Sequence, residues 1–150
     1  MKGDDPYGLN RFLSAQEGVY ERALAELKAG QKRTHWMWFI FPQIDGLGYS
    51  PTAKRYSIKS LEEARQYLNH PVLGKRLLEC TEAVVALKSG TVSEIFGYPD
   101  DMKFKSSMTL FEKIAGSDSV FSAALDKYCQ GERDAATLSL SEKPIFQTGK

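Results

Sequence analysis

The chain has 150 residues, 42% of them hydrophobic, and its 20 basic and 19 acidic side chains leave a net charge of +1. This length fits one domain that buries roughly two thirds of its unfolded surface, and the near-zero charge argues against nucleic acid as a partner. The two distant cysteines, Cys80 and Cys129, exclude the disulfide-rich secreted class and make a metal site unexpected. No apolar run approaches the roughly 18 residues that cross a bilayer, so we expect a cytoplasmic protein with no membrane association.

The first element predicted is a helix near the N-terminus. Apolar residues from Leu9 to Leu27 recur at helical spacing and form one stripe. Asp5 can act as its N-cap, Pro6 can occupy its first turn, and Gly30 can stop it. The pattern therefore predicts one long first helix.

Two further helices are predicted in the middle of the chain. The sequence Ser60-Leu61-Glu62-Glu63 is a capping box, which predicts a helix that runs to about Asn69. Pro71 ends that helix, because a proline disfavours helical geometry in the preceding residue, and can itself open the next one. The apolar positions of the next helix continue to about Gly90.

The remaining elements follow the same rules. A second capping box at Thr91 precedes a short helical turn that Gly97 closes. The two aspartates after Pro99 lie where the dipole of a following helix favours acidic side chains. Further helices are predicted over Ser119–Cys129 and from Asp134 onward.

These signals predict an all-α fold. We find no segment that alternates apolar and polar residues with the period of two that strands require. The expected architecture is a compact single-domain bundle of about six to seven helices over residues 1–140, with a short irregular aromatic and glycine segment. Residues 141–150 show no periodicity and are either a surface strap or disordered.

The least ordinary segment is the run His35–Gln43, which reads His-Trp-Met-Trp-Phe-Ile-Phe-Pro-Gln and contains both tryptophans of the chain. Neither an amphipathic helix nor a half-buried strand needs this mixture, because each would interleave polar positions on a solvent face. Gly46 and Gly48 follow, where a backbone without side chains lets a ligand approach closely. The pattern is neither a dinucleotide-binding fingerprint nor a P-loop.

Polar and basic residues flank this segment on both sides. Lys32 and Arg33 precede it, and Ser50 and the run Lys54-Arg55-Tyr56 follow it. Basic clusters beside an aromatic wall suit a ligand that has a flat ring to stack and an anion to pair, as a nucleotide has. The segment therefore predicts a ligand site that includes Tyr56.

The alternative interpretation is that the aromatic residues are core. Tryptophan and phenylalanine bury large areas, which favours packing roles for Trp36, Phe39 and Ile40. Trp38 and Gln43, together with Ser50, are the better candidates for a pocket. His35 is either a helix-end residue that bonds a backbone carbonyl or a group that titrates near neutral pH.

A second candidate cluster lies on the helix that follows Pro99. Lys103 and Ser107 are i,i+4 neighbours, so both can face one cavity, and Ser106 lies beside them. In one interpretation these groups reach a phosphate or carboxylate; in the other, each serine bonds a carbonyl one turn earlier. Sequence spacing cannot show whether His35 meets Asp101 or Ser107 in space.

These residues resemble an uncharacterised bacterial family, domain of unknown function 1810. The resemblance rests on His35–Ser50, Arg11-Phe12, Ala15-Gln16 and Lys103–Phe111, and on the closing residues Gly131, Asp134, Thr137 and Leu138. It covers the chain up to about Leu140, and it implies a mainly helical fold and no established activity. Members often carry the automatic label calpastatin, a name of disordered calpain inhibitors that this aromatic-rich chain does not resemble.

Two functional hypotheses follow. In the first, an enzyme or sensor binds a small anionic ring-bearing metabolite, of nucleotide or ADP-ribose type, between His35–Ser50 and Lys103–Thr109. Trp38 would stack on the ring, and Gln43 and Ser50 would orient the ligand. Lys103, Lys32 or Arg33 would pair with the anion. If a reaction occurs, His35 is the candidate general base or acid and Asp101 its orienting partner; no cofactor is expected. In the second, the domain is a non-catalytic protein-interaction module whose aromatic residues form the core.

Overall fold

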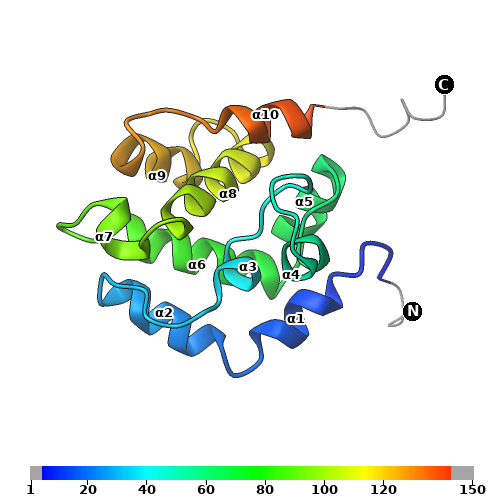
Figure 1. The fold of residues 1–150 in the computed structure, drawn as a ribbon, viewed down its shortest axis with the longest axis horizontal. Helices are drawn as coiled ribbons and strands as arrows, with labels where there is room; N and C mark the ends of the chain where they lie inside the picture. Colours follow the sequence, from blue (N-terminus) through cyan, green and yellow to red (C-terminus); the bar gives the residue numbers. More distant parts are fainter. Residues whose placement is uncertain (1–4, 143–150) are drawn as a thin grey trace.

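The computed structural model describes residues 5–142, which form ten α-helices (Figure 1). In chain order they are α1 (Asn10–Gln16), α2 (Tyr20–Lys28), α3 (Met37–Ile40), α4 (Pro51–Arg55), α5 (Leu61–Asn69), α6 (Leu73–Val85), α7 (Val92–Phe96), α8 (Asp100–Ala115), α9 (Val120–Tyr128) and α10 (Ala135–Ser141).

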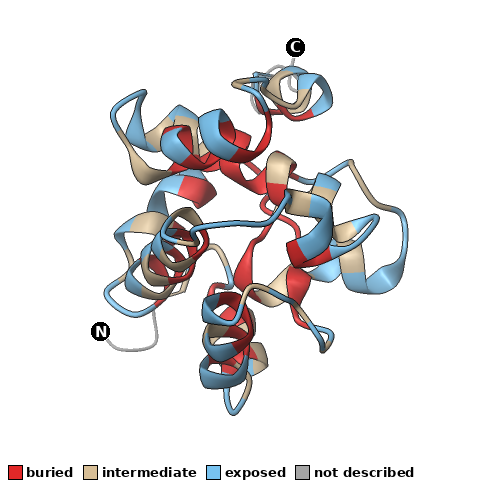
Figure 2. Cartoon of the chain, turned by 90° about the vertical axis from the view of Figure 1, so that its left-hand side faces the viewer, coloured by how far each residue is buried: buried red, intermediate tan, exposed pale blue. Residues whose placement is uncertain are grey.

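Two helices organise the packing. Helix α6 contacts α2, α5 and α9, whereas α8, the longest helix, contacts α5, α7, α9 and α10. The helices other than α4, which has no buried residue, turn their buried residues toward the interior and their exposed residues outward (Figure 2). The short helix α3 lies among the longer ones and contacts α1 and α6. The aromatic segment therefore enters the middle of the fold.

The core is rich in aromatic side chains. Phe41, which follows α3, lies edge-on to Phe104 of α8 with ring centroids 5.2 Å apart, and Phe104 stacks on Phe96 at 4.6 Å. Edge-to-face and offset-stacked pairs are the favoured arrangements of aromatic rings. Trp36 is fully buried beside them. The interpretation of Trp36 and Ile40 as packing residues is therefore confirmed.

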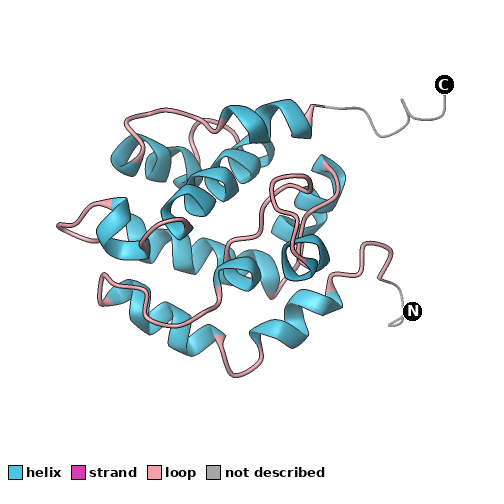
Figure 3. Ribbon diagram, viewed as in Figure 1, coloured by secondary structure: helices cyan, strands magenta, loops and turns pink. Residues whose placement is uncertain are grey.

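The all-α class is confirmed for the described residues, which contain no strand (Figure 3). One isolated parallel bridge joins Ile44 to Ile58, where the Ile58 amide donates to the Gln43 carbonyl and the Asp45 amide to the Ile58 carbonyl, both at 2.8 Å. This bridge fixes the loop that follows the aromatic segment. None of the described helices has the length and apolarity that crossing a membrane requires.

The number of helices was underestimated, partly because the predicted long first helix is two helices. Gly18 adopts a φ of +70°, which breaks the chain between α1 and α2, while the apolar stripe continues across the break. The Asp5 carboxylate does bond the amides of Leu9 and Asn10, but residues 6–9 precede the helix. Gly30 ends α2 as predicted, with a φ of +83°.

Most other helix ends follow their predicted signals. Thr91 and Glu94 form the complete capping box of α7, and Asp134 caps α10 through the Thr137 amide. At α5 only half of the predicted box forms: Ser60 accepts from the Glu63 amide, but the Glu63 carboxylate bonds Lys59 and Arg11. Helix α10 continues to Ser141, beyond the predicted limit; residues 143–150 of the predicted tail lie outside the described residues.

Candidate functional site

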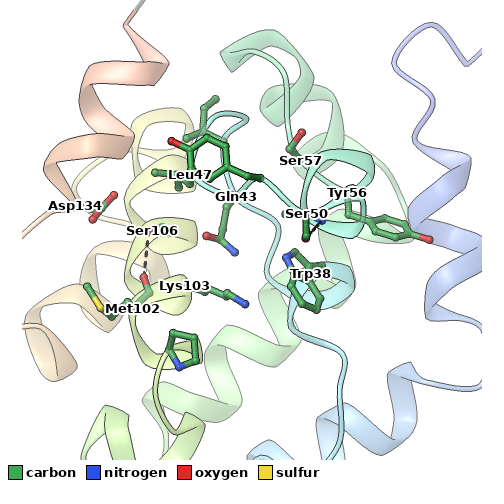
Figure 4. Close-up of a pocket in the computed structure, with 15 residues that line it drawn as sticks. Trp38, Gln43, Leu47, Ser50, Tyr56, Ser57, Met102, Lys103, Ser106 and Asp134 are labelled. Atoms are coloured by element: carbon green, nitrogen blue, oxygen red, sulfur yellow. Dashed lines mark hydrogen bonds between the residues drawn. The ribbon is translucent and has the colours of Figure 1, made fainter.

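A cleft of about 410 Å³ opens between the loop that follows α3, helix α4 and the first two turns of α8 (Figure 4). This volume falls within the range of roughly 300 to 1,000 Å³ that small-molecule sites occupy. The residues that line it combine aromatic, aliphatic and polar side chains: Trp38, Gln43, Ile44, Leu47, Gly48, Tyr49, Ser50, Ala53, Tyr56, Ser57, Pro99, Met102, Lys103, Ser106 and Asp134.

Lys103 supplies the cleft's positive charge. Its ammonium lies 4.1 Å from the centroid of the Trp38 ring and 3.5 Å from the nearer carboxylate oxygen of Asp100. The other oxygen of Asp100 is held more closely, at 2.8 Å, by Lys32. Since two cations share one carboxylate, this end of the cleft keeps one positive charge that Asp100 does not balance.

A buried carboxylate, that of Glu26, holds the chain that leads into α3. Glu26 of α2 accepts hydrogen bonds from the amides of Arg33 and Thr34, the Thr34 hydroxyl and, at 2.9 Å, the indole N–H of Trp36. Burial opposes the charge of Glu26, but these bonds outweigh it and lower the pKa of the carboxyl group to about 2. Glu26 thus fixes the chain that leads into α3 and Trp38.

Two residues that carry the family resemblance, Gln16 and Arg11, hold the backbone next to the cleft. Gln16 of α1 donates to the Phe39 carbonyl at 2.8 Å and accepts from Arg76, which fixes the end of α3. Arg11 donates to the carbonyls of Arg55 and Ser57 and pairs with a buried Glu63 carboxylate at 2.7 Å.

The glycine loop is packed closely against its neighbours. A Cβ atom at Gly48 would lie only 2.7 Å from the Cβ of Ala53, so the loop approaches α4 as closely as a glycine permits. Gly46 has a φ of +107° and faces Leu140 of α10, to which a Cβ would be 3.1 Å. Both glycines therefore serve close packing of the loop, and Ser50 caps α4 through the Ala53 amide.

The three hydroxyl groups in the middle of α8 differ in their partners. Ser106 and Thr109 each donate to the carbonyl one turn earlier, those of Met102 and Lys105. For Ser106 this is the bond to the carbonyl one turn earlier that the second interpretation of the α8 serines expects. Ser106 nevertheless also lines the cleft. Ser107 is fully buried, and its hydroxyl has no hydrogen-bond partner among the described residues.

Seven of the thirteen predicted site residues line the cleft together: Trp38, Gln43, Gly48, Ser50, Tyr56, Lys103 and Ser106. The other six do not line it, namely Lys32, Arg33, His35, Gly46, Asp101 and Ser107.

The predicted acid–base pair is not formed in this structure. His35 is exposed, and no hydrogen bond or ion pair joins it to Asp101 among the described residues. Asp101 instead accepts from the Ser93 hydroxyl at 2.8 Å and from the amide of the next residue in its own helix. Lys32 is largely buried between Asp100 and the Trp36 ring, which gives it a structural partner on each side.

Eight of the cleft residues were not selected from the sequence, and Tyr49 and Asp134 are two of them. Tyr49, whose side chain is 83% exposed, lies in the predicted glycine segment and could have been chosen as an aromatic residue between turn formers. Asp134 was identified as a helix start and as one of the closing residues of the family resemblance, but not as a site residue. No sequence signal shows that its carboxylate borders the cleft, because that depends on how α10 packs on α8.

Similarity to known proteins covers almost the whole chain. The chain is 51% identical to the conserved hypothetical protein Rv1873 from Mycobacterium tuberculosis, whose 1.38 Å crystal structure superposes with a TM-score of 0.91. The match covers 93% of this chain and 100% of that one. No curated protein is significantly similar. The model of the family described as Protein of unknown function (DUF1810) matches residues 6–141. The chain therefore belongs to this family of unknown function.

Proposed function

We propose that the cleft binds a small anionic metabolite that carries a flat ring, of the nucleotide or ADP-ribose type. One observation carries the proposal: the Lys103 ammonium lies at the cleft wall between the Trp38 ring and an Asp100 carboxylate that Lys32 already holds. An incoming anion can replace the long contact to Asp100 while Lys103 keeps its contact with the ring. Lys103 is the one basic residue among the described residues that line the cleft.

The other cleft residues supply the remaining contacts. Gln43 points into the middle of the cleft, near Lys103 and Ser106 (Figure 4), where its amide can donate to and accept from a ring or sugar. Tyr49 and Leu47 offer apolar surface on the loop side. In this arrangement Trp38 orients Lys103, and Tyr49 offers an exposed ring for stacking.

The alternative function is a non-catalytic protein-interaction module. That hypothesis expects Trp38 to be buried with no cavity beside it. Trp38 is half-buried and borders the cleft, which supports ligand binding over a purely structural aromatic segment.

The proposal includes a cytoplasmic protein. Cys80 and Cys129 are both free and buried, and burial raises the pKa of the Cys80 thiol to about 12. Cysteines that form no disulfide suit a reducing compartment. Fractionation of cells that express the chain tests this part.

A thermal-shift screen against nucleotides and ADP-ribose at millimolar concentration tests the proposal. A ligand that binds only the folded state raises the melting temperature by mass action. We expect a shift for at least one compound, and Lys103→Ala should abolish it while the melting temperature of the free protein stays within a few degrees.

Lys105→Ala is the matched control. Lys105 lies on the same helix, its side chain is 26% exposed against 24% for Lys103, and it also pairs with one carboxylate, that of Glu132, but it does not line the cleft. The control should keep the full ligand shift. Equal losses in both variants, or no shift with any compound, contradict the proposal.

A further inference from the structure

We infer that the cleft takes a ligand with a single anionic group at one end and hydrogen-bond donors at the other, so that it selects a nucleoside monophosphate over a diphosphate, with Asp134 as the residue that sets this specificity. The inference rests on the proposed function and narrows its ligand class.

The positive end of the cleft has the charge to pair with one anionic group. Lys32 and Lys103 together carry two positive charges, and Asp100 between them carries one negative charge. Lys32 is buried against Asp100 and Trp36, so Lys103 is the group that can turn to a ligand. No second arginine or lysine lines the cleft among the described residues.

The opposite end of the α8 wall is negative. The backbone amide of Asp134 donates to the Thr109 hydroxyl at 3.0 Å, which places Asp134 beside the turn of α8 that contains Thr109. Thr109 lies six residues after Lys103, a separation of about 9 Å along the helix axis. Ser106 lies between them and also lines the cleft. The wall therefore changes from positive to negative over the length of a small ligand.

The Asp134 carboxylate has one oxygen to offer a ligand. Its Oδ2 accepts from the amide and hydroxyl of Thr137 at 2.9 and 2.6 Å, which caps α10. Its Oδ1 accepts no hydrogen bond from the residues that the structure describes, and the side chain borders the cleft (Figure 4). A carboxylate oxygen only accepts, so its natural partners are sugar hydroxyls or a ring amino group.

The positive end at Lys103 and the negative end at Asp134 together favour a monophosphate over a diphosphate. One phosphate can pair with Lys103 while the sugar or ring donates to Asp134. In a diphosphate whose terminal phosphate pairs with Lys103, the inner phosphate lies on the Asp134 side of Lys103, where no second cation among the described residues lines the cleft. At separations below about 9 Å and the intermediate dielectric of a cleft, the repulsion between this phosphate and the Asp134 carboxylate amounts to about three- to tenfold in affinity.

Calorimetric titration of the full chain tests the inference, using the 5′-monophosphate and 5′-diphosphate of adenosine, guanosine, cytidine and uridine at low salt. We expect at least one monophosphate to bind at least threefold more tightly than its diphosphate. Asp134→Asn should reduce this ratio toward one, because asparagine still caps α10 but carries no charge. Asp134→Ser, which also retains a capping group, provides a second variant.

Glu132→Gln is the matched control. Glu132 is an exposed acid two residues away that does not line the cleft, so its loss changes the net charge equally but should leave the ratio unchanged. A diphosphate that binds as tightly as its monophosphate, with binding still lost in Lys103→Ala, overturns this inference and leaves the proposed function standing. The same holds if the Asp134 variants keep the wild-type ratio. Failure of every nucleotide to bind overturns both.

Discussion

The ammonium of Lys103 lies 4.1 Å from the centre of the Trp38 ring, so the cleft's cation and its largest aromatic ring form one unit. The sequence alone predicts them as separate contacts, one for the anion and one for the ring of the ligand. In the proposed function, Trp38 orients Lys103 through this contact. A cation held over a ring is worth about 0.5 to 2 kcal/mol, depending on how far it is removed from water.

The two tryptophans should differ sharply when each is replaced by phenylalanine. Trp36→Phe removes a buried indole and its hydrogen bond to the Glu26 carboxylate, which should cost about 2 to 4 kcal/mol of unfolding free energy. Trp38→Phe leaves a half-buried ring in place and should cost less than about 1 kcal/mol. Urea denaturation measures both values. Similar losses in the two variants would contradict the division between core and cleft.

Glu26 should make the fold sensitive to acid. Its pKa is near 4.5 in the unfolded chain and about 2 in the folded protein, so its contribution is complete above about pH 4.5 and disappears as the pH falls toward 2. The difference corresponds to about 3 kcal/mol. We expect Glu26→Gln to lower stability at pH 7 and to flatten the dependence of stability on pH between about 2 and 5. Denaturation curves across that range measure it, and Glu21→Gln, an exposed position on the same helix, should keep the wild-type slope.

Arg11 and Glu63 should show strong coupling. Arg11→Ala leaves the buried Glu63 carboxylate without its charge partner, which should cost about 3 to 5 kcal/mol. Adding Glu63→Gln removes the uncompensated charge, so the double variant should be more stable than Arg11→Ala alone. A double-mutant cycle from urea denaturation gives the coupling energy. Additive losses would mean that the pair contributes nothing beyond its separate contacts.

A methyl group at Gly48 should be tolerated only when the methyl group of Ala53 is removed. Gly48→Ala places two methyl carbons 2.7 Å apart, which should displace the loop, weaken ligand binding and lower the melting temperature. Gly48→Ala combined with Ala53→Gly removes the clash, at the modest cost of a glycine in the short helix α4. Recovery of the ligand shift in the double variant is the expected result. Unchanged binding in Gly48→Ala alone would show that the loop does not shape the cleft.

His35 and Asp101 should be dispensable for binding. Neither lines the cleft, and Asp101 is engaged by Ser93 and its own helix. His35→Ala and Asp101→Asn should therefore keep the wild-type dissociation constant for whichever nucleotide binds, as measured by calorimetry. A large loss of affinity in His35→Ala would contradict this expectation and would support the predicted role of His35 in the site.

Local signals predicted the helix ends well, because a cap is a contact between near neighbours in the chain. Thr91 and Asp134 show this, since each hydroxyl or carboxylate bonds an amide three residues later. The break at Gly18 was missed because the apolar stripe continues on both sides of it. A periodic pattern does not reveal where the backbone turns, and the glycine is the sole local cue.

The cleft could be predicted only in part. Residues of the aromatic segment and of α8 were assigned to one site because aromatic and basic side chains together suit an anionic ring, and seven of the thirteen do line one cleft. The roles of Glu26 and Asp134 depend on contacts between helices. A carboxylate in an amphipathic helix resembles a surface residue, so the sequence offered no sign that Glu26 would be buried with four hydrogen bonds.

The contact between Gly46 and Leu140 has a consequence for synthesis. The loop that forms one side of the cleft rests on the last described helix, which follows it by more than ninety residues in the chain. A growing polypeptide therefore contains the aromatic segment long before the surface that supports it. During translation this loop can rest on α10 only after the ribosome has made residues 135–141.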